Sequence, residues 1–180
     1  MLIFIPSLQL LALVSVAIWS TLIFSRGQFW RADQKLSNST ANLSKSPEIV
    51  IIIPARNEES TIGQSILSLL QQDYKGIMSI IVVNDNSQDN TVEVVKSISH
   101  GCDNIHLING SKTPNDWTGK LWSMAQGVKF ARKNFCHANY YLFSDSDILH
   151  HPKNLTELTA KALSGNLALV SLMVKLRCSS

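Results

Sequence analysis

The chain has 180 residues, of which 45% are hydrophobic and 16% are charged, and its formal net charge is +3. This length gives room for one domain and a short appendage, and the small charge, with no basic stripe among aromatic side chains, argues against a nucleic-acid-binding protein. Cys102, Cys136 and Cys178 are too widely spaced to form a Cys-x-x-Cys motif, which favours free thiols in a reducing compartment.

The first predicted element is an apolar helix at the N-terminus. The stretch Leu2–Phe24 carries no charged side chain, and a helix of that length measures about 35 Å, enough to cross a hydrocarbon core of about 30 Å. We therefore expect a transmembrane anchor over residues 1–25. A buried core helix and an uncleaved export signal are the alternatives. Because the basic residues come after this helix, the positive-inside rule places the rest of the chain on the cytoplasmic side of the membrane. They are Arg26, Arg31, Lys35 and Lys45.

Residues 26–46 are predicted to be a linker, because the stretch Gln34–Pro47 is rich in Ser, Asn and Thr and has no apolar period. A globular domain is predicted over residues 47–180. In it, short apolar runs alternate with segments that have apolar residues at helical spacing. The runs predicted as strands are Glu48–Pro54, Ser79–Val83, Ile105–Ile108, Tyr140–Phe143 and Leu167–Leu176. This alternation predicts an α/β domain with a mostly parallel sheet and helices on both faces.

Polar loops with acidic residues follow the first, second and fourth predicted strands: Ala55–Ser60, Asn84–Thr91 and Ser144–Asp147. The carboxyl ends of parallel strands meet at one edge of the sheet, where ligands bind in open α/β folds. Asp145 and Asp147 are suited to hold Mg²⁺ or Mn²⁺ together with phosphate oxygens. Taken alone, this acid pair is equally typical of a solvated loop.

The loop after the first strand contains no glycine, so it is neither a Gly-x-Gly-x-x-Gly dinucleotide motif nor a phosphate-binding P-loop. The absence of such a loop also argues against a nucleotidyltransferase. A nucleotide would have to be held by side chains such as Glu58 and Asp85, with a cation at Asp145 and Asp147 to neutralise its diphosphate.

Three segments carry a resemblance to a known family. Ile53–Glu58, Asn84–Thr91 and Asp145-Ser146-Asp147 resemble, in order and spacing, the landmarks of family-2 glycosyltransferases with the GT-A (Rossmann-like) fold. The resemblance covers Glu48 to Leu176. The segments 116–122 and 171–178 are similar to a narrower group, the membrane-bound glycosyltransferases associated with hopanoid biosynthesis.

The resemblance implies transfer of a sugar from a nucleotide-diphosphate sugar, commonly a UDP-sugar, to a lipid or saccharide acceptor, with Mg²⁺ or Mn²⁺ as cofactor. Asp145 and Asp147 would hold the metal. The family has two aspartates where this chain has Asn84 and Asp85. The residues implied in donor binding are Pro54, Ala55, Arg56, Glu58, Asp85, Lys120 and Asp145.

The resemblance stops short of the family's catalytic half. Neither the later carboxylate that serves as general base nor a Gln-x-x-Arg-Trp-like segment occurs in the sequence, so no catalytic residue is assigned. We expect an incomplete GT-A domain, its donor half, that binds the donor without efficient turnover. The alternative is a membrane-anchored nucleotide-sugar-binding module, or a decayed relic, without catalysis.

Several of these side chains also have simpler interpretations. Arg56 can pair with Glu58 or Glu59, Lys120 can be a solvated charge, and Asp89 can cap the helix that follows it. His150 and His151 are expected in an exposed loop rather than at a metal. Trp117 and Trp122 can stack on a sugar or lipid, with core packing favoured for Trp122.

Overall fold

The computed structural model describes residues 5–25, 36 and 46–175, and the chain divides into two compact units, Met1–Ser37 and Asn38–Ser180. The first contains α1 (Ile5–Ser25), whose segment Leu8–Ser25 has a mean hydropathy of 2.0 and is long and apolar enough to cross a membrane. Except for Leu36 and Ser46, the predicted linker lies outside the described residues, as do the four basic residues used to predict sidedness.

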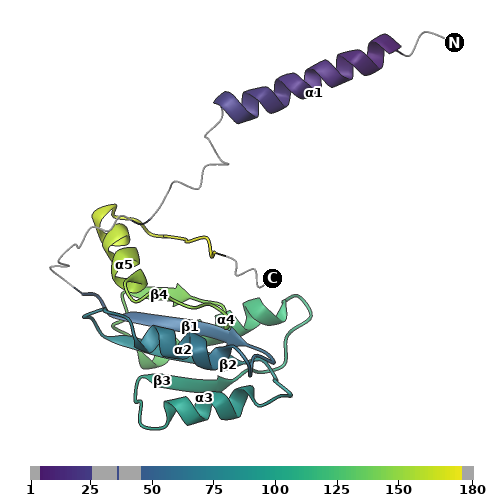
Figure 1. Cartoon of the computed structure of the whole chain (residues 1–180). Helices are drawn as coiled ribbons and strands as arrows, with labels where there is room; N and C mark the ends of the chain where they lie inside the picture. The colour runs from purple at the N-terminus through teal and green to yellow at the C-terminus, as the bar shows by residue number, and fades with distance from the viewer. Residues whose placement is uncertain (1–4, 26–35, 37–45, 176–180) are drawn as a thin grey trace. The chain divides into compact units, whose positions relative to one another are not determined.

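The second unit is built on four parallel strands in the order β3-β2-β1-β4 (Figure 1). The strands are β1 (Ile49–Ala55), β2 (Met78–Asn84), β3 (Ile105–Asn109) and β4 (Tyr140–Phe143). The helices are α2 (Ile62–Leu70), α3 (Thr91–Ser99), α4 (Gly119–Asn134) and α5 (Asn154–Ser164). The predicted parallel α/β architecture is confirmed, with strand limits within two residues of those predicted for these four strands.

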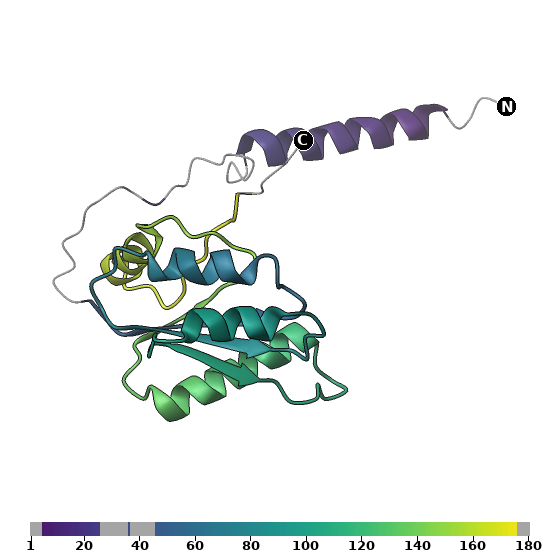
Figure 2. The same ribbon diagram turned by 60° about the horizontal axis from the view of Figure 1, so that its bottom comes forward.

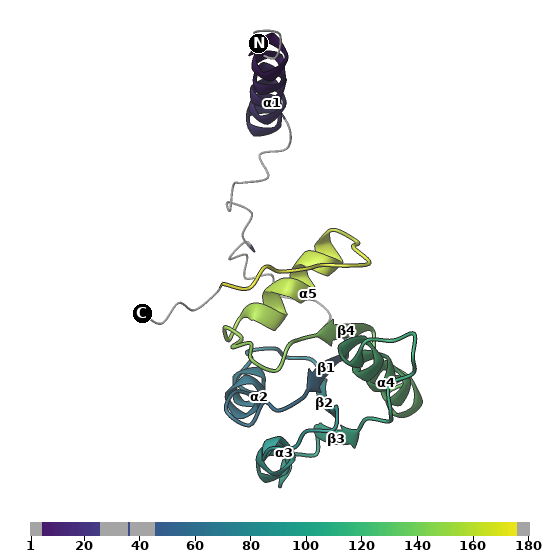
Figure 3. The same cartoon turned by 90° about the vertical axis from the view of Figure 1, so that its right-hand side faces the viewer.

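The two central strands are buried on both faces. Alternate residues of β1 point to opposite sides, so that Ile51 and Ile53 pack in the core beneath α2 and α3, whereas Val50 and Ile52 pack against α4. Figures 2 and 3 show α2 and α3 on one face of the sheet and α4 on the other. A parallel strand covered on both faces needs a continuous apolar run, which explains the unbroken Ile49–Ile53 sequence.

Helix α4 lies unusually close to the sheet at Gly127. A Cβ atom there would lie 2.5 Å from Cγ2 of Ile52 and 3.1 Å from Cγ2 of Val83. A glycine in a helix interior is unfavourable by about 1 kcal/mol relative to alanine. Here it allows the helix to approach the sheet, and this approach brings the first turn of α4 over the carboxyl ends of β1 and β2.

The fifth predicted strand is wrong. Residues 167–175 form no strand, and Leu176 lies outside the described residues. After α5 the chain turns at Asn166, whose φ is +46°, and the N–H of Leu167 donates to the carbonyl of Ala162 (2.8 Å). The segment then runs beside α5, and Met173 is 99% exposed (Figure 3). An apolar run forms a strand only where a neighbouring strand supplies hydrogen bonds, and residues 167–175 form no strand pairing with β4, although Leu167–Val170 line a shallow pocket with it.

Two of the three cysteines fall among the described residues. Cys102 and Cys136 are both unpaired, in agreement with the prediction of free thiols, and Cys178 lies outside the described residues.

Candidate functional site

The loops that follow β1, β2 and β4 surround a cavity of about 420 Å³ at the carboxyl edge of the sheet. Every side chain predicted to bind donor or metal lines it, which places together residues almost a hundred positions apart. The lining residues are Pro54, Ala55, Arg56, Glu58, Asp85, Gly119, Lys120, Ser123, Asp145, Ser146 and Asp147. The structure thus brings the predicted residues into one site, while the role of each stays a prediction.

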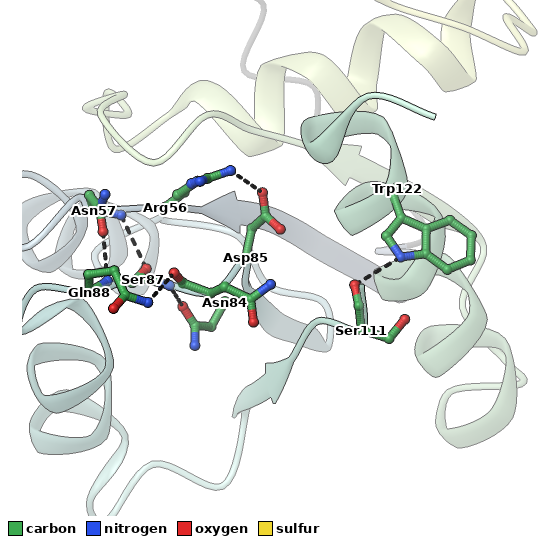
Figure 4. A network of polar contacts seen from close by, with 9 residues as sticks. Arg56, Asn57, Asn84, Asp85, Ser87, Gln88, Ser111 and Trp122 are labelled. Atoms are coloured by element: carbon green, nitrogen blue, oxygen red, sulfur yellow. Dashed lines mark hydrogen bonds and ion pairs between the residues drawn. The ribbon is translucent and has the colours of Figure 1, made fainter. Parts of the chain in front are cut away.

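The loops after β1 and β2 are joined by hydrogen bonds (Figure 4). The N–H of Asn57 donates to Oγ of Ser87 (3.1 Å), and the N–H of Gln88 donates to Oδ1 of Asn57 (2.8 Å). Asn57 has a φ of +55°, in the left-handed region that asparagine tolerates better than most residues. The two loops therefore hold each other in place.

A second group of bonds joins the loop after β1 to the start of α3. The N–H of Glu58 donates to Oγ1 of the buried Thr91 (2.8 Å), and the N–H of Glu59 donates to Oδ2 of Asp89 (3.1 Å). The other oxygen of Asp89 accepts from the N–H of Thr91, the first residue of α3 (3.1 Å), although the N-cap position itself is Asn90. Because Asp89 also binds the neighbouring loop, it is more than a helix cap.

Asp85 places a nearly buried carboxylate in the wall of the cavity. The residue is only 7% exposed, and its Oδ2 lies 3.7 Å from Nη1 of Arg56 (Figure 4). The predicted pairing of Arg56 with Glu58 or Glu59 is therefore wrong, because Arg56 turns toward Asp85 instead. A Cβ atom on Gly119 would lie 2.8 Å from Oδ2 of Asp85, so the glycine at the start of α4 leaves room for this carboxylate.

Asp145 and Asp147 form the opposite wall, on the turn that follows the edge strand β4. Both are exposed, and Oδ1 of Asp145 lies 2.6 Å from Nζ of Lys120 on α4. Lys120 is thus paired across the cavity rather than simply solvated. No group of three or more His, Cys, Asp or Glu side chains that could hold a metal occurs in the described part of the chain. A cation at this acid pair would need oxygen ligands from water or from a substrate.

A hydrogen-bond network outside the cavity lining connects this turn to the start of α5. Ser144, which is buried, contacts Nε2 of His150 through its Oγ (2.9 Å), and Nδ1 of His150 contacts Nδ2 of Asn154 (3.1 Å). Burial lowers the pKa of His150, so its imidazole is neutral near pH 7. The expectation of an exposed loop is wrong for His150, which is half-buried, whereas His151 is exposed.

Three of the lining residues were not singled out from the sequence: Gly119, Ser123 and Ser146. Ser123 is fully buried, and its Oγ has no hydrogen-bond partner among the described residues. The segment 116–122 was recognised only for its resemblance to relatives. Gly119 and Ser123 lie one turn apart on α4, and the sequence alone carries no signal that this turn faces the cavity.

Trp122 lies in the first turn of α4 and Trp117 just before this helix, and neither is among the residues that line the cavity. The indole N–H of Trp122 donates to the carbonyl of Ser111 (3.1 Å; Figure 4). Trp117 packs edge-to-face on Trp122, with ring centroids 5.3 Å apart, and is itself 45% exposed. Trp122 is half-buried and belongs to neither core cluster, so the core packing favoured for it is not found, and Trp117 presents an aromatic surface to solvent.

Comparison with known proteins assigns this site to a family. The sequence profile of "Glycosyl transferase family 2" matches residues 50–178, well over half of the chain. The chain belongs to glycosyltransferase family 2. Two bacterial family relatives illustrate the similarity. "Probable glycosyltransferase YdaM" of Bacillus subtilis is 37% identical over 94 residues, 52% of this chain and 22% of its own. "4,4'-diaponeurosporenoate glycosyltransferase" of Staphylococcus aureus is 34% identical over 123 residues, which are 68% of this chain and 30% of the relative. The chain therefore spans less than a third of the length of either relative.

Two solved structures share the fold of this chain. S. aureus TarS (residues 1–349), in complex with UDP-GlcNAc, has a TM-score of 0.54 and 25% identity, over 66% of this chain and 32% of its own. The mannosyltransferase PcManGT of Pyrobaculum calidifontis, in complex with GDP-Man and Mn²⁺, has a TM-score of 0.51 and 20% identity. The match covers 67% of this chain and 33% of PcManGT. The predicted GT-A type of sheet is confirmed by these neighbours.

Proposed function

We propose that this chain forms the donor-binding part of a glycosyltransferase that takes a sugar from a nucleotide-diphosphate sugar, with Mg²⁺ or Mn²⁺, and passes it to a lipid or saccharide acceptor. One observation carries the proposal. A nearly buried carboxylate (Asp85) and an exposed acid pair (Asp145, Asp147) line opposite walls of one cavity, together with Arg56 and Lys120.

The wall around Asp85 is suited to a nucleoside. A carboxylate accepts hydrogen bonds only, so a buried one favours a ligand that offers N–H or O–H donors. The ring N–H of uracil and the ribose hydroxyls are such donors. Pro54 and Ala55 add apolar surface beside them, and Glu58 lies at the same wall. Binding of UDP-GlcNAc by TarS, a relative in fold at 25% identity, supports uracil as the base.

The wall around Asp145 is suited to a metal-bound diphosphate. Its carboxylate already accepts one cation, the ammonium of Lys120, at 2.6 Å. Two carboxylates with free space beside them fit Mg²⁺ or Mn²⁺, which complete their coordination with water and phosphate oxygens. When bound, the metal would stabilise the negative charge that develops on the departing diphosphate. Lys120 would then exchange its carboxylate partner for a phosphate oxygen.

The acceptor is proposed to be a lipid presented at a membrane, with α1 as the anchor and the sheet domain on the cytoplasmic side. The apolar helix Leu8–Ser25 and the exposed ring of Trp117, just before α4, support this proposal. The relative from S. aureus is named as a glycosyltransferase of 4,4'-diaponeurosporenoate. The resemblance of segments 116–122 and 171–178 to hopanoid-associated enzymes makes a hopanoid one specific candidate.

Calorimetric titration of the full chain in detergent with UDP, with and without Mn²⁺, tests the proposal. We expect binding that requires Mn²⁺ and disappears in an Asp145→Ala/Asp147→Ala double variant. A Glu93→Ala/Asp103→Ala variant, which removes two exposed acids away from the cavity, is the matched control and should bind as the wild type does. Failure of the folded wild type to bind UDP or GDP would refute the proposal. Assaying sugar transfer by the same preparation separates an enzyme from a binding-only module.

A further inference from the structure

We propose that His150 is a positioning residue that acts through Ser144 to hold the Asp145–Asp147 turn in the conformation that binds the metal and diphosphate. The inference rests on the proposed function of that turn. His150 contacts neither acid directly, and it lies behind the turn rather than in the cavity lining.

The turn needs support because of where it lies. β4 is at the edge of the described sheet, paired with β1 alone, and Phe143 is 47% exposed. Beyond the strand, the N–H of Ser144 still donates to the carbonyl of Ile52 (3.2 Å). Asp145 and Asp147 are both exposed, whereas Ser144 and Ser146 beside them are buried, so packing does little to fix the side chains of the two acids.

The network supplies this support through three side-chain hydrogen bonds that lead from Asn154 to the carbonyl of Asp145. Nδ2 of Asn154 donates to Nδ1 of His150, which leaves the single proton of the neutral imidazole on Nε2. Nε2–H then donates to Oγ of Ser144, and Oγ–H of Ser144 donates to the carbonyl of Asp145 (3.1 Å). The last bond fixes the peptide plane between Asp145 and Ser146, and so the direction in which both acids leave the backbone.

His150 is itself held by two helices. Its backbone N–H donates to Oγ of Ser68 on α2 (3.0 Å), and its ring contacts Asn154 at the start of α5. Oγ of Ser68 in turn donates to the carbonyl of Ser65 within α2 (2.7 Å). The network therefore transfers the rigidity of two packed helices to a turn at the exposed edge of the sheet.

Two substitutions of His150 separate positioning from a general structural role. The amide of glutamine reaches the position of Nε2 and can donate to Ser144, whereas the amide of asparagine reaches only the position of Nδ1 and faces Asn154. His150→Gln thus keeps the bond that positions the turn, and His150→Asn keeps the bond to the helix. Each loses one side-chain bond, so the pair is matched in its structural cost.

The first readout is the affinity of the full chain in detergent for UDP with Mn²⁺, by calorimetry. We expect His150→Asn and Ser144→Ala to weaken binding by about 3- to 10-fold, the size of one hydrogen bond, and His150→Gln to stay within about twofold of wild type. The double variant Ser144→Ala/His150→Asn should be no weaker than either single variant, because both break one pathway.

The second readout needs no ligand. Amide hydrogen exchange over residues 144–149 of the ligand-free chain should become faster in His150→Asn and Ser144→Ala and remain unchanged in His150→Gln. Equal effects of the two His150 variants, or none in either readout, would overturn the inference. If wild type binds no UDP with Mn²⁺, the proposed function fails, and the exchange comparison still decides whether His150 positions the turn.

Discussion

The two walls of the cavity are built in different ways. On the wall formed by the loops after β1 and β2, six hydrogen bonds join one loop to the other, and Asp85 is nearly buried. On the wall after β4, both acids are exposed, β4 pairs with one strand, and Lys120 neutralises Asp145. The first wall is held by hydrogen bonds within the protein, whereas the acids of the second wall are open to solvent and to the proposed cation.

Under the proposed function, the two walls contribute to donor binding in different ways. A fixed wall selects the nucleoside at little entropic expense, because its side chains are already ordered. An exposed wall lets a metal and diphosphate enter and leave with solvent. Variants in the two walls should therefore fail in different ways: those in the first lose both stability and nucleoside affinity, and those in the second lose metal and phosphate binding alone.

The largest effect is expected from Asp85→Asn. Exchanging the carboxylate for an amide removes the charged acceptor for the nucleoside, and a hydrogen bond to a charged group contributes about 1.5–3 kcal/mol, so UDP affinity should fall by about 10- to 100-fold. Calorimetry with UDP and Mn²⁺ measures it. Asp103→Asn, which changes an exposed acid outside the cavity lining, is the control. Equal affinity of wild type and Asp85→Asn for UDP would contradict a contact between Asp85 and the nucleoside.

Thr91→Val should lower stability next. The hydroxyl of this buried residue accepts from the N–H of Glu58 (2.8 Å) and donates to Oδ1 of Asp89 (2.5 Å), and valine has the same shape without these bonds. Loss of the hydrogen bond from the half-buried N–H of Glu58 should reduce the free energy of unfolding by about 0.5–1.5 kcal/mol, measured by urea denaturation. Thr156→Val, which breaks an exposed bond to Asp73, is the control, and an equally small change in both would contradict a preassembled wall.

Lys120→Met should produce smaller effects of opposite sign. Without the ammonium, Asp145 is free for a metal, so affinity for Mn²⁺ alone should rise, by up to about fivefold for an exposed ion pair. Affinity for UDP with Mn²⁺ should fall, because a phosphate contact is lost. Electron paramagnetic resonance of free Mn²⁺ reports the first effect and calorimetry the second. Lys129→Met, on an exposed part of α4, should change neither, and a fall in both affinities for Lys120→Met would show that the lysine does not compete with the metal.

The smallest expected effect is a pH dependence at His150. Burial lowers its pKa in the folded state below the value of about 6.5 in an unfolded chain. The unfolded state therefore binds more protons as the pH falls, so this contribution to stability is complete above about pH 6.5 and is lost progressively below it. Urea denaturation of wild type and His150→Gln at several pH values between 5 and 8 measures it. A constant difference between the two proteins across this range would contradict the assignment.

Sequence patterns predicted the central part of the fold well. The continuous apolar runs of β1 and β2 are typical of parallel strands covered on both faces, and the structure contains both strands. The fifth strand failed because its apolar run says nothing about whether a neighbouring strand is available. Asn166, which turns the chain back after α5, was not read as a turn signal.

The site divides in the same way. The acids and Arg56 were predicted as site residues because their residue types follow strand ends in a parallel sheet. The ion pair of Arg56 with Asp85 was not predicted. Gly119 and Ser123 were missed because their importance comes from the close approach of α4 to the sheet, a tertiary property. The role of His150 depends on Asn154 and Ser68, which the fold brings to it from two helices.

The bonds that join the loops after β1 and β2 have a consequence for how the domain assembles. They connect residues only 30 to 33 positions apart, whereas the bond from the N–H of Glu48 to Asn139, beside β4, spans 91 positions. Closing the shorter loops loses less chain entropy, so short-range contacts form sooner. During synthesis the β1–β2 wall can therefore acquire its shape while the segment that carries Asp145 is still being made.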